Sequence, residues 1–547
     1  MFHRWWRRAS LAALERPFDL VVIGGGINGC GIFFDAAQRG LRVLLVERQD
    51  LASGTSSRSS KLIHGGLRYL KSLQLGVTRT SVRERDRQLA LNPHLVTPLP
   101  WLYPTYRGDT TPGWKAELGL RIYDALTKLP DKHGRVGAHE MRVMAPGVAT
   151  DGLDRALVYQ DARVDDARLT WAVAATGAAY GGHVLTRAEP EELRRGPGGD
   201  LLGLVIRDLE HGATHDVTTS LVVNATGVWV DQIRHRFGLD GDTVRPSRGS
   251  HILLAPDRLP LRAAVTVLHP ADRRPAFLIP HPEGVLVGTT DLFHGGELDD
   301  PRPTPEEIDY LLAACAAGFV GEPVTHADIR GAFAGVRPIV ESGIREGETP
   351  SSASREEAIW FEKGILSVAG GKLTTWRATA EEALDEALKH LPHDVAKKAS
   401  SCATAGTPLA RLAPADLGER LAGATAEMPS KIAHGMARRL GAAAWIATDQ
   451  AADSELQPLV GHSDICAAEV RMHLRHGAVL HLSDLLLRRL RVGMWHPETA
   501  RDLAVPVARL AALELGWDTT RRGAELERFA EELVAWTAEG VRETGAG

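Results

Sequence analysis

The sequence predicts an α/β protein that starts with a nucleotide-binding domain built on parallel strands. An antiparallel sheet and a C-terminal helical domain are expected to follow. Three observations predict this fold: a strand–glycine–helix segment at residues 18–47, a strand-rich region at 245–340, and an almost wholly helical texture at 410–540. With 547 residues, the chain is too long for one hydrophobic core, so two or three domains are expected.

The glycine-rich segment is FDLVVIGGGINGCGIFFDAAQRGLRVLLVE. Its short apolar run at 20–23 is typical of a buried strand, and Gly24, Gly26 and Gly29 follow with the spacing G-x-G-x-x-G. Glycines allow the sharp turn and let the backbone approach a pyrophosphate, while the helix that follows points its N-terminal dipole at that anion. The pattern predicts a Rossmann-like dinucleotide site. The alternative is a structural turn without a ligand.

The end of this unit supports the same interpretation. Gly40 predicts a left-handed helix end, and a second buried strand is expected over 41–46. Glu47 then closes that strand, where an acid can accept the hydroxyl groups of a ribose. These features do not separate a nicotinamide from a flavin dinucleotide.

Composition excludes several classes of protein. The net charge of −5 provides no excess of basic residues for nucleic acid, and the apolar (44%) and charged (24%) fractions are those of an ordinary globular protein. The four cysteines form no C-x-x-C pair, so neither a disulfide framework nor a structural zinc site is indicated. We expect a reducing compartment, no bound metal and no nucleic-acid partner.

The N-terminal residues MFHRWWRRASLAALERPF allow two interpretations. Their apolar part is too short for a signal peptide, and neither uncharged stretch of the chain, 20–34 or 169–186, predicts a transmembrane helix. The arginines and tryptophans of residues 4–8 would suit a membrane surface. The alternative is a short helix that caps the fold.

A polar loop at 50–70 carries the most specific motif. It is rich in hydroxyl groups and glycines, and a long polar loop beside a nucleotide turn is usually functional. Its segment SSKLIHGGLRYL, together with GGGINGCG before it, closely resembles the FAD-dependent glycerol-3-phosphate dehydrogenases of the D-amino-acid-oxidase-like flavoprotein group. The resemblance covers nearly the whole chain and implies FAD as cofactor, glycerol 3-phosphate as substrate and a helical C-terminal domain.

Two later turns repeat the strand–glycine–helix pattern. Residues 216–223 are strand-like and lead into Asn224-Ala225-Thr226-Gly227, which resembles a second dinucleotide contact, although an ordinary strand-to-helix turn is the alternative. A strand at 365–368 leads into GGKLTT at 370–375 and a helix to residue 388. By resemblance this last element lies at the flavin pyrimidine edge, where a positive helix end stabilises the reduced flavin. The residues predicted to bind FAD are Gly24, Gly26, Ile27, Asn28, Gly29, Glu47, Thr55, Ser56, Ser57, Ser60, Lys61, Leu62, His64, Ala225, Gly227, Gly371, Lys372, Leu373 and Thr374.

The resemblance also implies the substrate site. Arg68, Arg337 and Lys372 stand at the family's substrate positions, and an arginine fork suits a phosphate, although a surface ion pair is its usual role. His251 opens an apolar strand expected to face the flavin, and its ordinary pKa suits removal of a hydroxyl proton. A structural strand histidine is the alternative for His251, and His64 is the next candidate. The predicted catalytic residues are His251, Arg337 and Lys372, and the predicted substrate-binding residues are Arg68, Tyr69, Arg337, Lys372 and Thr374.

The predicted domain organisation divides the chain at a linker. An oxidoreductase region spans 1–395, with FAD-binding segments at about 18–95, 155–240 and 355–392 and substrate-sheet segments at about 96–154 and 241–354. The linker is 396–408 and the helical domain 409–547. Helices are predicted at 78–91, from Asp161 to Tyr180, at 499–515 and at 521–536, and a further helix is predicted to be N-capped by Ser483.

The resemblance implies oxidation of sn-glycerol 3-phosphate to dihydroxyacetone phosphate, with electrons passed to a membrane quinone. It also implies peripheral attachment to the inner face of the cell membrane, and a homodimer is possible. Ser354-Arg355-Glu356-Glu357 departs from the S-R-D-H pattern common in the family. An oxygen-using glycerophosphate oxidase would usually carry an insertion for which 341–364 leaves little room. An amino-acid or hydroxy-acid oxidase and a flavin-binding regulatory protein are the remaining alternatives.

Overall fold

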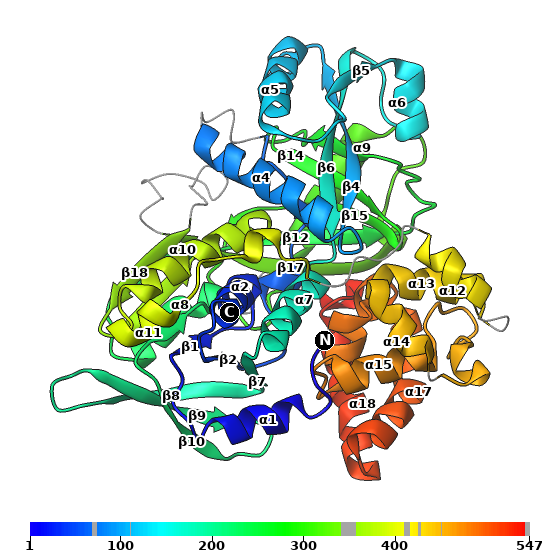
Figure 1. Cartoon of the computed structure of the whole chain (residues 1–547). Coiled ribbons are helices and arrows are strands. Elements are labelled where there is room, and N and C mark those ends of the chain that lie inside the picture. The colour runs from blue at the N-terminus through cyan, green and yellow to red at the C-terminus, as the bar shows by residue number, and fades with distance from the viewer. Residues whose placement is uncertain are drawn as a thin grey trace.

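The computed structural model describes residues 1–67, 74–109, 111–340, 357–409, 416–424, 428–449 and 451–541. Three sheets and a C-terminal group of helices organise these residues (Figure 1). The predicted α/β class, with its nucleotide-binding, antiparallel and C-terminal helical parts, is confirmed.

The nucleotide-binding sheet has the strand order β18-β19-β11-β1-β2-β7 and is parallel except for β18. Its strands are β1 (Leu20–Ile23), β2 (Val43–Glu47), β7 (His183–Thr186), β11 (Val222–Asn224), β18 (Ala358–Glu362) and β19 (Ile365–Ala369). The helices associated with it are α1 (Trp6–Ala13), α2 (Ile27–Gln38), α7 (Asp166–Ala179), α8 (Val230–Arg236), α10 (Trp376–Leu388) and α11 (His393–Lys398). Because β1, β2, β11 and β19 lie side by side, the three glycine-containing turns that follow β1, β11 and β19 meet at one edge of the sheet.

The largest sheet is mostly antiparallel. Its main path is β16-β12-β15-β14-β13-β4-β6-β3, with β17 paired to β12 and β5 paired to β6. Its strands are β3 (Leu62–Ile63), β4 (Val96–Tyr106), β5 (Gly134–Val136), β6 (Leu153–Val164), β12 (Val244–Leu254), β13 (Ala264–Leu268), β14 (Pro275–His281), β15 (Gly284–Gly288), β16 (Leu292–Phe293) and β17 (Ile329–Val340). The associated helices are α4 (Leu75–Leu91), α5 (Gly113–Leu126), α6 (Ala138–Met144) and α9 (Pro305–Gly318). A third, small antiparallel sheet consists of β8 (Ala188–Arg195), β9 (Leu201–Asp208) and β10 (Thr214–Thr218).

The C-terminal helices, yellow to red in Figure 1, pack beside α7 and against the large sheet. They are α12 (Leu417–Ala424), α13 (Ser430–Leu440), α14 (Ala444–Asp449), α15 (Ala467–His476), α16 (Val492–Trp495), α17 (Pro497–Leu515) and α18 (Thr519–Val534). The ring of Trp536 lies 5.3 Å from that of Phe333 in β17, so the two regions share one hydrophobic core.

Several local predictions are confirmed and others are corrected. The strand over 20–23, the helix after it and the left-handed Gly40 (φ +89°) are present. The helix expected from Asp161 begins later, because β6 extends to Val164 and Asp165 is the N-cap of α7. The strand predicted over 216–223 is two strands, β10 and β11, in different sheets. Ser483 precedes a π-helical turn at Asp484–Arg489 and makes no capping hydrogen bond, so that prediction is wrong.

Some of the predicted domain limits fall inside helices or strands of the structure. The expected boundary at residue 155 falls inside β6, and β3 lies in the large sheet although its sequence belongs to the predicted FAD-binding segment. The predicted linker begins within α11. The chain therefore crosses between sheets more often than composition indicates.

Candidate active site

A cavity of about 610 Å³ lies between the nucleotide-binding sheet and the large sheet. One wall is formed by the glycine turn after β1, the loop at 53–60, and the turns after β11 and β19. The opposite wall includes Trp101 of β4, Phe277 of β14 and Arg337 of β17. A single site therefore joins the dinucleotide-binding motifs to the antiparallel sheet.

The glycines after β1 have separable roles. An added Cβ on Gly24 (φ +109°) would lie 2.6 Å from the carbonyl oxygen of Ala225, and one on Gly29 would overlap the carbonyl oxygen of Gly24. The fold itself therefore requires these two glycines. Gly26 has an ordinary φ of −77°, and its added Cβ would meet only Ser56 Oγ, at 3.3 Å. Since Gly26 lines the cavity, its missing side chain leaves room for a ligand rather than for the protein, which fits a bound dinucleotide.

Hydrogen bonds join the glycine turn, residues 24–29, to the hydroxyl-rich loop at residues 53–60, called the hydroxyl loop below, and to Ala52 just before it. The backbone N–H of Ile27 donates to Ser56 Oγ at 2.9 Å, and that of Ala52 donates to the Gly25 carbonyl oxygen at 2.9 Å. Glu47 accepts the backbone N–H of Gly25 at 2.6 Å while also lining the cavity. Burial raises the pKa of the Glu47 carboxyl above its usual value, and the backbone donors of Gln49 and Gly25 oppose this shift.

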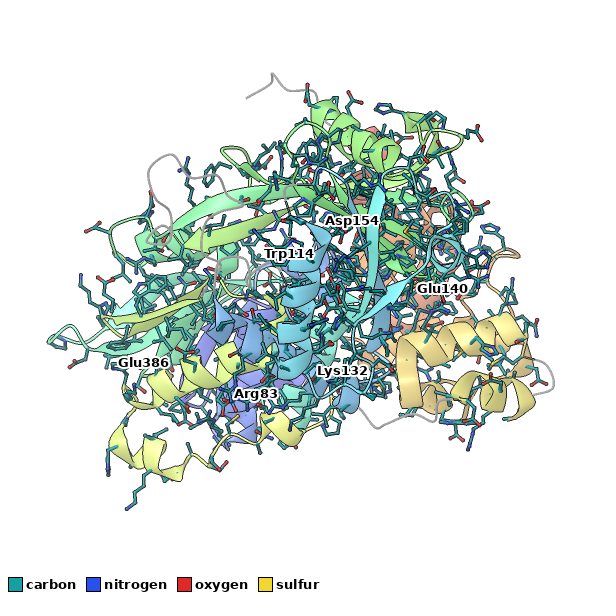
Figure 2. The ribbon with its side chains drawn as sticks, turned by 90° about the horizontal axis from the view of Figure 1, so that it is seen from above. Arg83, Trp114, Lys132, Glu140, Asp154 and Glu386 are labelled. Carbon is teal, nitrogen blue, oxygen red and sulfur yellow. The ribbon has the colours of Figure 1, made fainter. Side chains whose placement is uncertain are left out.

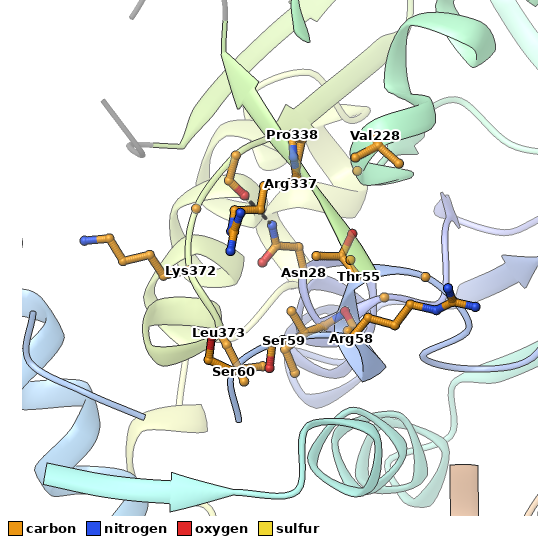
Figure 3. Close-up of a pocket in the computed structure, with 18 of the residues that line it drawn as sticks. Asn28, Thr55, Arg58, Ser59, Ser60, Val228, Arg337, Pro338, Lys372 and Leu373 are labelled. Atoms are coloured by element: carbon orange, nitrogen blue, oxygen red, sulfur yellow. Dashed lines mark hydrogen bonds between the residues drawn. The ribbon is translucent and has the colours of Figure 1, made fainter. Parts of the chain in front are cut away.

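Arg337 reaches the cavity from β17 and is held in place. Its Nη1 donates to Asp291 Oδ1 at 3.2 Å, and its Nη2 donates to Thr289 Oγ1 at 3.0 Å. An added Cβ on Gly249 would collide with the guanidinium, so this glycine of the neighbouring strand makes room for the arginine. In Figure 3 the Arg337 guanidinium lies in the centre beside Asn28, and the side chains of Lys372 and Arg58 extend away from it in opposite directions. Arg337 and Lys372 are thus two of the cationic residues that line the cavity together with the nucleotide turn.

The two candidate histidines are placed differently. His64 lines the cavity directly after β3, and its backbone N–H donates to Thr374 Oγ1 at 3.1 Å. His251 lies in the middle of β12, is 1% exposed and is not among the lining residues of the described chain. Its Nε2 is 2.9 Å from Ser60 Oγ and its ring stacks on Phe333. The expectation that His251 faces the ligand directly is therefore corrected: it lies behind Ser60.

The charge state of His251 agrees with its burial. Desolvation lowers the pKa of the imidazole well below its ordinary value, and the positive charges of Arg337 and Lys61 lower it further. The ring is neutral at neutral pH. Its Nδ1 has no hydrogen-bond partner among the described residues.

Three other predicted cofactor contacts lie behind the cavity wall. Gly29 packs on Gly24, Ser57 is 1% exposed, and Lys61 is fully buried with its Nζ donating to Asp166 at 2.9 Å and to the Ser57 carbonyl oxygen. Burial lowers the pKa of Lys61 to about 8, although Asp166 opposes this effect. Arg68, Tyr69 and residues 341–356, which include Ser354 to Glu356 of the departing motif, lie outside the described residues. The predicted residues that do line the cavity are Gly24, Gly26, Ile27, Asn28, Glu47, Thr55, Ser56, Ser60, Leu62, His64, Ala225, Gly227, Arg337, Gly371, Lys372, Leu373 and Thr374.

Sequence reasoning missed some residues of the cavity wall. Thr289 and Asp291, which hold Arg337, come directly after β15, and a strand running into Gly-Thr-Thr-Asp is a signal that could have identified them. Trp229 and Arg236 also line the cavity; Trp229 lies two residues after the Asn224-Ala225-Thr226-Gly227 turn, and Arg236, at the end of α8, stands in no motif.

Comparison with known proteins agrees with this arrangement. Residues 19–385 match the family described as FAD dependent oxidoreductase, and residues 394–522 match the C-terminal domain of alpha-glycerophosphate oxidase. The chain therefore belongs to the FAD dependent oxidoreductase family, whose cofactor is FAD.

The relatives narrow this class. The glycerol-3-phosphate dehydrogenase 2 of Mycobacterium bovis is 36% identical over 97% of this chain and 92% of its own length. The aerobic glycerol-3-phosphate dehydrogenase of Staphylococcus epidermidis is 38% identical over 71% of this chain and 70% of its own length. The crystal structure of the glycerol-3-phosphate dehydrogenase from Bacillus halodurans, complexed with FAD, matches with a TM-score of 0.78, 25% identity and full coverage of both chains.

Proposed function

We propose that this protein oxidises sn-glycerol 3-phosphate to dihydroxyacetone phosphate with FAD. The observation that carries the proposal is one cavity in which the dinucleotide turn and the cationic side chains Arg337 and Lys372 meet. The names of the relatives, which cover nearly the whole chain, support the same substrate.

The residues on the nucleotide-sheet side would hold FAD. The open backbone at Gly26 and the helix α2 behind it suit the pyrophosphate, and Glu47 suits the ribose hydroxyls. When bound, FAD supplies the oxidising power by accepting a hydride. The turn at 370–374 offers a positive helix end, with α10 directly after it, beside His64.

Arg337, on the large-sheet wall, and Lys372, on the nucleotide-sheet wall, would hold the substrate phosphate. The Arg337 guanidinium is anchored by Asp291 and Thr289, so it loses little conformational entropy when it grips an anion. Lys372 adds a point charge from the turn at 370–374, and Thr374 of the same turn is fixed against His64. The same role for Arg68 and Tyr69 stays a prediction.

We further infer that His64, rather than His251, removes the substrate hydroxyl proton. His64 lines the cavity together with Lys372 and Thr374, and its backbone is hydrogen-bonded to Thr374. His251 instead accepts or donates a hydrogen bond at Ser60 and orients that hydroxyl. A neutral, buried imidazole in that position supports the wall of the site without contacting the substrate.

The test is steady-state turnover of the purified flavoprotein with an artificial electron acceptor, together with identification of the product. The expected result is turnover of glycerol 3-phosphate to dihydroxyacetone phosphate, with glycerol and D-amino acids inert at the same concentrations. Equal or faster turnover of an amino acid would contradict the proposal.

A membrane quinone is the proposed physiological acceptor, and oxygen is the alternative. The match of residues 394–522 to a domain named for an oxidase keeps this alternative open. The rate of oxygen uptake without added quinone separates the two acceptors. We expect oxygen uptake to be slow and substrate turnover to become faster when a soluble quinone is added. Oxygen consumption at the full rate of the quinone reaction would identify an oxidase.

Association with an anionic membrane surface is also proposed, but at a different place from residues 4–8. Arg7 is buried and its Nη2 donates to Asp208 Oδ1 at 2.5 Å, and Trp6 packs on the core, so these residues of α1 cap the fold. The described residues contain no helix that is long and apolar enough to cross a membrane.

Helix α5 presents the apolar stripe that this association requires. Trp114, Leu118 and Ile122 are 53%, 51% and 42% exposed and recur every four residues, so they lie on one face. In Figure 2, which looks onto α5, Trp114 lies near one end and Lys132 beyond the other. The exposed cations Lys115 and Arg121 lie on α5 itself, and exposed Lys128 and Lys132 follow it in the chain; an apolar stripe accompanied by exposed cations suits a helix lying on anionic lipid.

Sedimentation with vesicles tests this surface. We expect binding to vesicles containing phosphatidylglycerol at low salt, partial release at high salt, and loss of binding when Trp114, Leu118 and Ile122 are all changed to serine. Leu513→Ser, at a residue 75% exposed on α17, is the matched control. Binding of the triple variant at the wild-type level would contradict the assignment. A homodimer stays a prediction, which the molar mass in solution tests.

A further inference from the structure

Three arginines of the C-terminal helical region reach the back of the FAD site. Arg488 and Arg489 are the last two residues of the π-helical turn at Asp484–Arg489, and Arg491 is the N-cap of α16 directly after it. These residues are 6%, 1% and 0% exposed, and none of them lines the cavity. Sequence inspection assigned no chemistry to this region.

The first two arginines hold the start of the hydroxyl loop. Arg488 Nε donates to Asp50 Oδ2 at 2.6 Å, and Arg489 donates to both carboxylate oxygens of Asp50, at 2.9 and 2.8 Å. Asp50 is 1% exposed, and its carbonyl oxygen accepts the N–H of Ser53, the first loop residue that lines the cavity. Ala52, two residues after Asp50, has a φ of +61°, which is uncommon for a residue with a side chain.

The third arginine holds the end of the same loop. Arg491 Nη2 donates to Asp166 Oδ1 at 3.1 Å and to the Ser57 carbonyl oxygen at 3.2 Å. Asp166 in turn accepts the hydroxyl of Ser59, which lines the cavity, at 2.8 Å, and the ammonium of Lys61, whose φ is +55°. Left-handed, non-glycine residues thus stand at both ends of the loop, and each end is fastened by an arginine from the C-terminal region.

We propose that Arg488, Arg489 and Arg491 are positioning residues for FAD, so that the C-terminal helical region completes the cofactor site. They act through Asp50 and Asp166 on the loop at 53–60, most of whose residues line the cavity. Charge-assisted hydrogen bonds between fully buried partners are strong and directional, so they can keep a strained loop in one conformation. This proposal concerns FAD affinity and does not depend on which substrate the enzyme oxidises.

The chain contains a matched control for a merely structural role. Arg439 is 7% exposed and donates to Glu469 at 2.6 and 2.7 Å and to Asp464 at 2.7 Å. It has the same kind of buried, bidentate ion pair in the same region, but the side-chain hydrogen bonds of Glu469 and Asp464 go to Arg438 and Arg439 and not to the loop at 53–60.

The experiment compares Arg491→Lys, Asp50→Asn and Arg439→Lys in the full-length protein. Each apoprotein is titrated with FAD, flavin fluorescence gives the dissociation constant, and the melting temperature of the apoprotein measures the purely structural effect. Arg491→Lys and Asp50→Asn should each weaken FAD binding about tenfold or more, since each loses at least one charge-assisted hydrogen bond. Arg439→Lys should lower the melting temperature of the apoprotein about as much as the other two variants do, but its FAD affinity should stay within about twofold of wild type.

A second readout is the visible spectrum of the reconstituted variants, because a loosened loop changes the surroundings of the bound flavin. Wild-type FAD affinity in both Arg491→Lys and Asp50→Asn would overturn the proposal. An equal loss of affinity in Arg439→Lys would overturn it as well, because the effect would then be one of general stability. If one of the two loop variants does not fold, the other decides by the same criteria.

Discussion

At the scale of single residues, the glycines of the first turn divide into those the fold needs and one that the ligand needs. Gly26→Val should fold, because a Cβ added at Gly26 meets only Ser56 Oγ, but it should purify without FAD, because the side chain occupies the pyrophosphate's approach. Flavin absorbance per mole of protein and far-ultraviolet circular dichroism measure the two effects. Full flavin content in this variant would show that the dinucleotide does not pass over Gly26.

Gly29→Ala provides the contrast to that variant. Its methyl group would overlap the Gly24 carbonyl oxygen, so it should lower the yield of folded protein rather than affect FAD alone.

The two histidines make opposite predictions for catalysis. His64→Asn should lower kcat by about 10²-fold or more, as expected when a general base is removed. His251→Asn should retain most of the activity, and the pH at which kcat/KM falls on the acid side should stay unchanged, because the pKa of His251 is already held well below neutrality by burial. The pH profiles of both variants check this. A profile shifted only by His251→Asn would restore that residue as the base.

Arg337 provides the sharpest test of substrate binding. Arg337→Ala should lower kcat/KM about 100-fold or more, because it removes a bidentate, charge-assisted grip, and Arg337→Lys should recover only part of this. The carboxylate of Asp291 keeps Ser247 as a partner at 2.6 Å, so the melting temperature should fall only modestly. Steady-state kinetics with an artificial acceptor measure the effect. Near-normal kcat/KM in Arg337→Ala would make Arg337 a structural ion-pair partner.

At the scale of elements, the connection between α4 and β4 contributes to acid sensitivity. His94 lies there against Gly441, and burial, reinforced by Arg168, lowers the pKa of its imidazole to about 4 from an unfolded value near 6.5. Because the unfolded chain binds the proton more tightly, this contribution to stability is complete above about pH 6.5 and is lost as the pH falls towards 4.

His94→Asn should therefore flatten the decline in unfolding free energy between pH 6.5 and 4.5, by at most about 2–3 kcal/mol. Denaturant unfolding at several pH values measures this. Other buried histidines, such as His473, retain their own share of the decline. The control is His462→Asn, whose side chain is 57% exposed. An unchanged slope in His94→Asn would contradict the assignment.

The elements also show what local sequence can and cannot predict. The strand–glycine–helix unit at residues 20–40 was predicted almost to the residue, because hydrophobic pattern and glycine spacing are local signals. The boundary predicted at about 155 falls inside β6, which pairs with β4 of the large sheet, because strand pairing over long distances leaves no local mark. Ser483 failed as a cap because the segment after it forms a π-helical turn.

At the scale of the whole molecule, the site could be predicted where motifs face the ligand directly. Most residues named from the glycine turn, the hydroxyl loop and the GGKLTT segment line one cavity, although the turns lie hundreds of residues apart. The sequence could not show that His251 and Lys61 lie behind the cavity wall. Whether a side chain faces the cavity or the protein interior depends on strand register and on partners such as Ser60 and Asp166. The role of Arg491 was invisible for the same reason: its partners lie more than 300 residues earlier.

We propose that the single cavity between the two sheets brings FAD and glycerol 3-phosphate together. Anaerobic titration of the purified flavoprotein, followed by its visible spectrum, tests this directly. Glycerol 3-phosphate should bleach the flavin band with one equivalent of dihydroxyacetone phosphate formed per flavin, and Arg337→Ala should need a far higher concentration for the same bleaching. A flavin that stays oxidised with glycerol 3-phosphate but is bleached by an amino acid would contradict the account.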